Sequence, residues 1–159
     1  MSDCSGPLLT RSFPVTGGNF DDAGLVSGRI KGLLKEMGFA STVLRKTAIV
    51  AYEAEMNIVS YARQGIITIA ILPHHVTIEA IDEGQGIADI RMAMQQGWST
   101  ANERIREMGF GAGMGLHNIR TFSDIFHLSS DVGIGTRLKS IIEIGPETDG
   151  LVRGGNDER

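Results

Sequence analysis

Cysteine is nearly absent from this sequence of 159 residues, in which Cys4 is the single one. A lone cysteine has no partner in the chain, which excludes an internal disulfide framework and favours a reducing compartment. No apolar run approaches the roughly 20 residues that a membrane-spanning helix needs, and the start lacks a basic stretch followed by an apolar one. We therefore expect a cytoplasmic protein with no membrane partner.

An excess of basic residues is also missing. Lysine and arginine number 15 against 19 acidic residues, for a net charge of −4, and no basic stripe stands out that would suit a nucleic-acid partner. The hydrophobic content of 42% and the charged content of 21% are those of an ordinary globular protein. We expect an N-terminal tail at 1–7, one domain at 8–145 and a disordered tail at 146–159.

Common phosphate-binding and kinase motifs are absent as well. The sequence contains no G-x-x-x-x-G-K-[ST], no H-R-D and no D-F-G, which excludes a P-loop protein and a kinase of the eukaryotic type. No histidine lies in a helical dimerisation segment that would carry a phosphoacceptor, so an isolated histidine-kinase catalytic domain is disfavoured. The four histidines are His74, His75, His117 and His127.

Hydrophobic periodicity predicts an α+β protein. Apolar residues alternate in the expected strands and recur at helical spacing in the expected helices. Helices that occur between hairpin-linked strands favour a two-layer α/β sandwich, a mixed sheet with helices on one face. The expected strands are 8–15, 66–72, 75–81, 125–130 and 137–144, and the expected helices are 19–37, 41–65, 88–96 and 116–124.

The longest expected helix carries Glu53 and Asn57, four residues apart and therefore on one face. The neighbouring side chains Ile49 and Met56 are apolar, so a carboxylate and an amide among them either pair with another group or cost free energy. Taken alone, this spacing is common in helices and is equally typical of a partly exposed polar face.

Two glycine-containing segments follow. In the first, Asp82 leaves a strand and is followed by Gly84 and Gly86, which suits a ligand that approaches the backbone closely but also a capped turn. In the second, Gly109 to Leu116 (GFGAGMGL), alternate glycines lead into a helix. Backbone N–H groups at a helix start favour an anion, and glycines let a phosphate reach them; a hinge or a helix-packing role is the alternative.

Taken in order, these segments resemble a known set of motifs. The order of the motifs is similar to that in the Bergerat-fold (GHKL) ATPases, which include gyrase, heat-shock chaperone and histidine-kinase ATPases. The motifs are E-x-x-x-N, then D-x-G-x-G-I, then G-x-G-x-G-L, and then G-I-G-T before the last strand. The resemblance covers 13–144. The short chain and DEGQGIADIRMAMQQGWST resemble the bacterial anti-sigma factors and switch-protein serine kinases. NIVSYARQG and 97–100 are most similar to the stressosome switch-protein branch.

The resemblance implies a role for each motif residue. Glu53 would be the catalytic base, Asn57 would hold Mg²⁺, Asp82 would accept the adenine amino group, and 97–108 would form a lid over ATP. Arg104 and Arg106 in that segment are candidates for a cation beside the phosphates, but a solvated lid is the favoured interpretation, and neither is a catalytic candidate. The implied cofactor-binding residues are Asn57, Asp82, Gly84, Gly86, Ile87, Gly111, Gly113, Met114, Gly115, Leu116 and Thr136.

The implied function is an ATP- and Mg²⁺-dependent serine/threonine kinase that phosphorylates a STAS-domain anti-sigma-factor antagonist. The alternative is an ATP-gated anti-sigma factor that sequesters a sigma factor; a third is an activator of a phosphatase. Ser60 and Tyr61 stand where sporulation-type members carry a histidine, which disfavours the anti-sigma role. The group includes dimers and monomers, so both a homodimer and a monomer stay open. We also expect Gly113→Val to abolish nucleotide binding and leave a folded domain.

Overall fold

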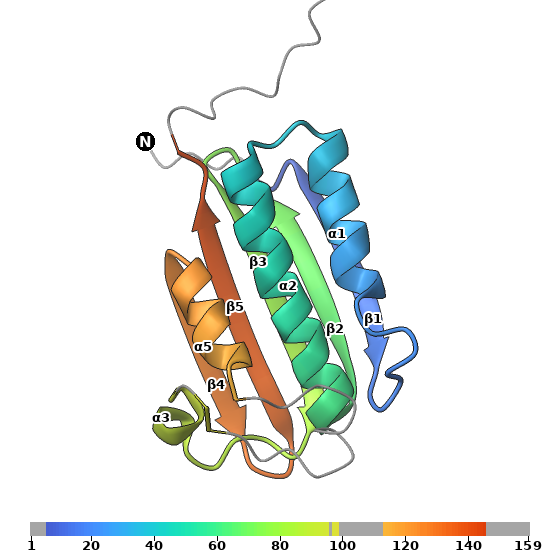
Figure 1. The fold of residues 1–159 in the computed structure, drawn as a ribbon, viewed down its shortest axis with the longest axis vertical. Helices are drawn as coiled ribbons and strands as arrows, with labels where there is room; N and C mark the ends of the chain where they lie inside the picture. The colour runs from blue at the N-terminus through green and yellow to red at the C-terminus, as the bar shows by residue number, and fades with distance from the viewer. Residues whose placement is uncertain (1–5, 96, 99–112, 146–159) are drawn as a thin grey trace, which may run out of the picture.

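The computed structural model describes residues 6–95, 97–98 and 113–145. Helices α1, α2 and α5 lie together against one face of a sheet, and α3 lies beyond the edge formed by β4 (Figure 1). This arrangement confirms the predicted two-layer α+β sandwich. The elements are β1 (Leu9–Thr16), α1 (Leu25–Glu36), α2 (Ser41–Tyr61), β2 (Ala62–Ile71), β3 (His75–Gly84), α3 (Ile90–Ala93), α5 (Gly115–Phe122), β4 (Ile125–Asp131) and β5 (Gly135–Glu143).

The sheet has the strand order β1-β2-β3-β5-β4, and each neighbouring pair is antiparallel. The prediction of a mixed sheet is therefore wrong in its strand pairing. β4 runs parallel to β3, but β5 lies between the two and pairs with both. An antiparallel sheet can leave one face to solvent, and none of the helices in the described ranges lies on the face of the sheet opposite α1, α2 and α5 (Figure 1).

The core lies between the sheet and α2, the central helix of the layer. Alternate residues of β2 and β3 point toward this helix and are buried, because side chains along a strand alternate between the two faces. The small residues Ala51 and Ala54 of α2 are fully buried in this core. The largest fully buried side chains include Ile30, Leu34, Ile58, Ile67, Ile69, Ile71, Ile78, Ile119 and Ile142.

The largest differences from the predicted helix bounds are at the start of α1 and the end of α2. α1 begins at Leu25, several residues after the predicted cap, because the buried carboxylate of Glu55 accepts hydrogen bonds from the backbone N–H groups of Gly24, Val26 and Ser27 at 2.8–3.1 Å. Helix α2 ends at Tyr61 and not at Gly65, which lies in β2. A Cβ on Gly65 would lie 2.8 Å from Ile58 Cδ1, so this glycine allows close helix–strand packing.

Several predictions concern residues outside the described ranges. These predictions are the first five residues of the N-terminal tail, the whole C-terminal tail at 146–159, and most of the lid, including 99–108. The domain limits stay a prediction. Within the described ranges, no helix is long and apolar enough to cross a membrane.

Candidate functional site

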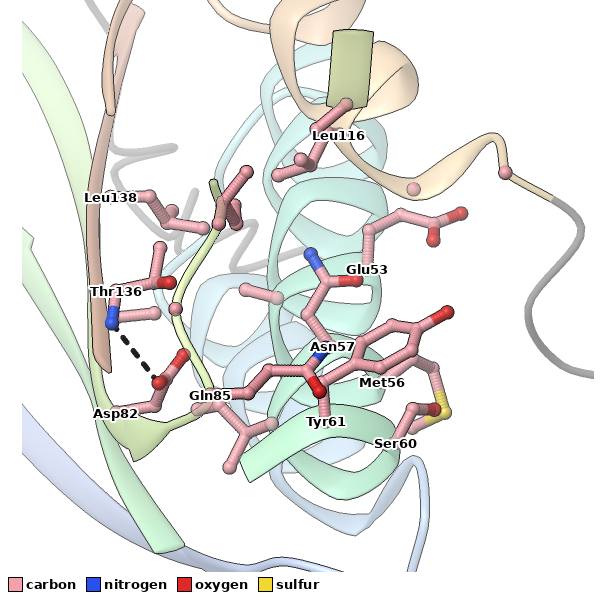
Figure 2. Close-up of a pocket in the computed structure, with 18 of the residues that line it drawn as sticks. Glu53, Met56, Asn57, Ser60, Tyr61, Asp82, Gln85, Leu116, Thr136 and Leu138 are labelled. Atoms are coloured by element: carbon pink, nitrogen blue, oxygen red, sulfur yellow. Dashed lines mark hydrogen bonds between the residues drawn. The ribbon is translucent and has the colours of Figure 1, made fainter. Parts of the chain in front are cut away.

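A cavity of about 720 Å³ opens between α2 and the end of the sheet formed by β3 and β5. Its walls come from α2, the segment that follows β3, and the start of α5, three regions far apart in the sequence. This volume lies within the range of about 300–1,000 Å³ that is typical of small-molecule sites. Figure 2 shows Glu53 and Asn57 on the α2 side, and Asp82 and Thr136 on the sheet side. All four predicted residues line the cavity.

Glu53 and Asn57 meet the start of α5 at Gly115. A Cβ built on Gly115 would lie 3.2 Å from Glu53 Oε2 and 3.2 Å from Asn57 Oδ1. The two oxygens therefore converge on the same point, and the absence of a side chain at Gly115 keeps that point open. A carboxylate and an amide oxygen arranged in this way suit a hard cation and a group that loses a proton.

Asn118 is a site residue that the sequence reasoning missed. Its Nδ2 donates a hydrogen bond to Glu53 Oε1 at 3.0 Å. Asn118 follows Gly115 by three residues on α5, so both lie on the same face of this helix. The available signal was an amide beside the apolar residues Leu116 and Ile119, directly after the glycine-rich stretch.

Asp82 lies near the end of β3, half-buried, and the backbone N–H of Thr136 on β5 donates to its Oδ1 at 3.1 Å (Figure 2). Burial raises the pKa of the Asp82 carboxyl above its usual value of 3.8, although the hydrogen bond from Thr136 opposes the shift. That bond is accepted by Oδ1, and among the described residues no hydrogen bond to Oδ2 is found. It can therefore accept a hydrogen bond from a ligand amino group.

Only one of the two predicted glycines after Asp82 lines the cavity. Gly84 is not among its lining residues; a Cβ there would lie 2.9 Å from Tyr61 O and 3.0 Å from Ala62 Cα, so it permits close packing of β3 on the α2–β2 junction. Gly86 lines the cavity with φ +71°, and a Cβ there would lie 2.7 Å from the backbone carbon of Asp131. It therefore also packs against the β4–β5 hairpin.

A serine hydroxyl on β4 connects the segment that follows β3 with β5, and the sequence did not predict it as a site residue. Ser130 Oγ accepts from the backbone N–H of Ile87 at 2.8 Å and lies 2.9 Å from Thr136 Oγ1. Ile87 and Thr136 both line the cavity, whereas Ser130 lies behind them. The signal was a serine at an inward-facing position of a strand whose other inward residues, Phe126 and Leu128, are apolar.

The part of the second glycine segment that is described also lines the cavity. Gly113, Met114, Gly115 and Leu116 are all among the lining residues. Gly113 has φ +76°, and its carbonyl accepts a hydrogen bond from Gly97 N–H at 2.9 Å, which joins the segment after α3 to the segment before α5. The remaining predicted residues of this region lie outside the described ranges. They are Gly109, Gly111, Arg104 and Arg106.

The charge of the cavity is one-sided. Among the described residues that line it there is no lysine, arginine or histidine, whereas Glu53, Asp82 and Asp89 contribute carboxylates. A polyanion such as a triphosphate would therefore need a cation beside it. The N-terminus of α5 contributes only a partial positive charge. A divalent cation with oxygen ligands fits this donor set, since Asn57 Oδ1 faces the open point at Gly115.

No protein-family model matches the chain. It is 41% identical over 105 residues to the anti-sigma F factor of Caldanaerobacter subterraneus subsp. tengcongensis, covering 63% of this chain and 68% of the relative. It is 32% identical over 115 residues to the serine/threonine-protein kinase RsbT of Bacillus subtilis, covering 70% and 80%. An anti-sigma F factor of a Thermoanaerobacter species is 39% identical over 107 residues, covering 64% and 70%.

Proposed function

Because this chain belongs to the family of anti-sigma factors and switch-protein serine kinases of the GHKL group, we propose that it is an Mg²⁺-dependent serine/threonine kinase of a bacterial partner-switching system. Membership of the family implies ATP binding. The proposed protein substrate is a STAS-domain anti-sigma-factor antagonist. The observation that carries the proposal is the convergence of Glu53 Oε2 and Asn57 Oδ1 on Gly115 inside the cavity.

Each side chain of the site has a task in this proposal. Asn57 Oδ1 is a ligand of Mg²⁺, which prefers oxygen donors and keeps several waters or phosphate oxygens. Asp82 Oδ2 accepts the amino group of adenine at the sheet end of the cavity, and Thr136 holds Asp82 in place. The backbone from Gly113 to Leu116 lies along the triphosphate. Bound Mg²⁺ supplies the positive charge that the described cavity wall lacks.

Glu53 is the proposed catalytic base. Its Oε2 accepts the proton of the substrate serine or threonine as that O–H bond breaks, while the hydroxyl oxygen bonds to the γ-phosphorus of ATP. The bond between this phosphorus and the β–γ bridging oxygen breaks, and its electron pair leaves with ADP. Phosphoryl transfer needs mainly in-line placement and charge neutralisation, so one base, one cation and a close backbone are sufficient.

The test is phosphotransfer from Mg-ATP to the STAS-domain proteins of the same genome, detected as phosphoserine or phosphothreonine. We expect Glu53→Gln, which keeps the shape and removes the base, to lower kcat by about 10²–10⁴-fold, the usual contribution of a general base. Glu79→Gln on the outer face of β3 is a matched control and should leave kcat unchanged. Absence of phosphotransfer by the wild-type chain to every such partner contradicts the proposal.

A second candidate function is favoured by the names of two relatives, each an anti-sigma F factor at 39–41% identity. In this alternative the chain sequesters a sigma factor, and the bound nucleotide selects which partner is held, as a shift of population. A pull-down that recovers a sigma factor in the presence of ATP, but no STAS-domain protein, supports it. Recovery of both partners, with phosphorylation of the STAS protein, supports the two roles in one chain.

A further inference from the structure

The carboxylate of Glu53 has two oxygens in different surroundings. Oε1 accepts the hydrogen bond from Asn118 Nδ2 at 3.0 Å, whereas Oε2 faces Gly115 and lies on the side of Asn57. Among the described residues, Asn118 provides the single hydrogen bond to this carboxylate. A glutamate side chain has several rotatable bonds, and fixing it costs up to about 2 kcal/mol of conformational entropy. The bond from Asn118 therefore selects one orientation of the carboxylate.

The position of Asn118 is itself well determined. Its backbone N–H donates to Met114 O at 2.8 Å, which places it in the first turn of α5. The next residue, Ile119, is fully buried and anchors the helix in the core. One face of α5 thus presents the bare backbone of Gly115 to Glu53 Oε2 and the Asn118 amide to Oε1. The same short helix defines both the open point and the orientation of the carboxylate beside it.

We propose that Asn118 is a positioning residue that holds Glu53 so that Oε2, and not Oε1, takes the proton of the protein substrate. This inference rests on the proposed kinase function. The Asn118 amide carries no net charge and donates to Oε1, whereas Oε2 is the oxygen that shares the point at Gly115 with Asn57 Oδ1, so Asn118 orients the base through the other oxygen. Loss of this hydrogen bond leaves Glu53 free to rotate away from the substrate hydroxyl, with the nucleotide contacts of Asp82 and Asn57 intact.

The test compares Asn118→Ala with wild type, Glu53→Gln and the double variant in steady-state phosphotransfer. We expect Asn118→Ala to lower kcat by about 10–100-fold, part of the 10²–10⁴-fold contribution of a general base, with the KM for ATP and the melting temperature nearly unchanged. The double variant should be no slower than Glu53→Gln, because a positioning residue acts only through the residue that it holds. His117→Ala, one residue earlier on α5, is the matched control and should have the wild-type kcat.

The outcomes separate this inference from the proposed function. If Glu53→Gln is impaired and Asn118→Ala has the wild-type kcat, the positioning role is wrong and the kinase proposal stands. A raised KM for ATP with unchanged kcat also overturns the inference, because it indicates a contact with the nucleotide. An additional loss in the double variant overturns it as well. If wild-type chain shows no phosphotransfer, the kinase proposal fails and this inference fails with it. Should Asn118→Ala not fold, Asn118→Ser removes the same amide.

Discussion

Replacement of Gly115 by alanine should separate ligand binding from folding stability. Gly115 is the first residue of α5, and its φ is not positive, so alanine fits the local backbone. A methyl group there would lie 3.2 Å from Glu53 Oε2 and 3.2 Å from Asn57 Oδ1. At such a separation the neighbouring atoms must yield by a few tenths of an ångström. The variant therefore places its only added atom where we propose that the cation and the phosphates approach.

The effects on stability and on binding are separate, and the sign of the first depends on how far Glu53 and Asn57 yield to the added methyl group. Gly→Ala at a compatible backbone position stabilises a protein by about 0.4–1 kcal/mol, because the unfolded chain loses conformational freedom. Mg²⁺ tolerates little departure from an octahedral shell at about 2.0–2.1 Å, so displacement of Asn57 Oδ1 should weaken the Mg²⁺ ligand that we propose. Loss of one interaction with a charged group costs about 1.5–3 kcal/mol, which corresponds to a roughly 10–100-fold higher Kd for Mg-ATP.

The assay is calorimetric titration with a non-hydrolysable Mg-ATP analogue, beside urea denaturation of the ligand-free protein. Gly32→Ala is the matched control, because Gly32 lies within α1 and a Cβ there would meet nothing within 4 Å; it should raise stability and leave the Kd unchanged. A Gly115→Ala variant that binds as tightly as wild type refutes the reasoning. Gly113→Val is a poorer test than its sequence suggested, since φ is +76° and a Cβ would press on the backbone of Gly97 and Trp98.

Three further predictions follow from single contacts. Asp82→Asn should weaken ATP binding by about 1 kcal/mol, roughly fivefold in Kd. In the wild type the Kd should rise as the pH falls from neutral through the raised pKa of Asp82, because the carboxylate is the accepting form; Asp82→Asn should lack this dependence in titrations at several pH values. Glu55→Gln should destabilise the fold by about 1–3 kcal/mol in urea denaturation, because an amide cannot accept all three N–H groups at the start of α1. Gly86→Ala should cost more than about 1 kcal/mol by the same assay, because φ is +71° and a Cβ would press on the Asp131 backbone; unchanged stability would contradict the packing role.

The stability contribution of Asp82 in the ligand-free protein has the opposite pH dependence to binding. Its pKa in the folded state is raised above the usual value of 3.8. The folded state therefore binds this proton more tightly than the unfolded chain, and the resulting stabilisation is complete below the usual pKa. It is lost as the pH rises through the raised pKa. Burial of Asp82 at the sheet end of the cavity thus lowers stability at the pH where its carboxylate is the better acceptor.

Much of the site was predictable because its motifs depend on local geometry. Glu53 and Asn57 share a helix face through the helical period, and Asp82 leaves a strand that alternation had located. Gly115 adjoins the two α2 residues as the order of motifs suggested. The strand pairing was not predictable in the same way. β5 enters the sheet between β3 and β4, and this insertion makes every pair antiparallel.

The sequence by itself determined the two layers, the family resemblance and the shared helix face of Glu53 and Asn57. These features depend on the periods of 3.6 residues in helices and 2 residues in strands, and on the few places where glycine is needed. Only the tertiary structure decided which carboxylate of α2 faces the cavity and which is buried beneath α1. Glu53 and Glu55 are two residues apart on α2, yet Glu53 faces the cavity and Glu55 is 2% exposed beneath α1. The rotation of α2 about its axis, relative to α1 and α5, sets this difference and also brings Glu53 to Asn118. Contacts between elements produce no periodic pattern in the sequence, so they could not be predicted from it.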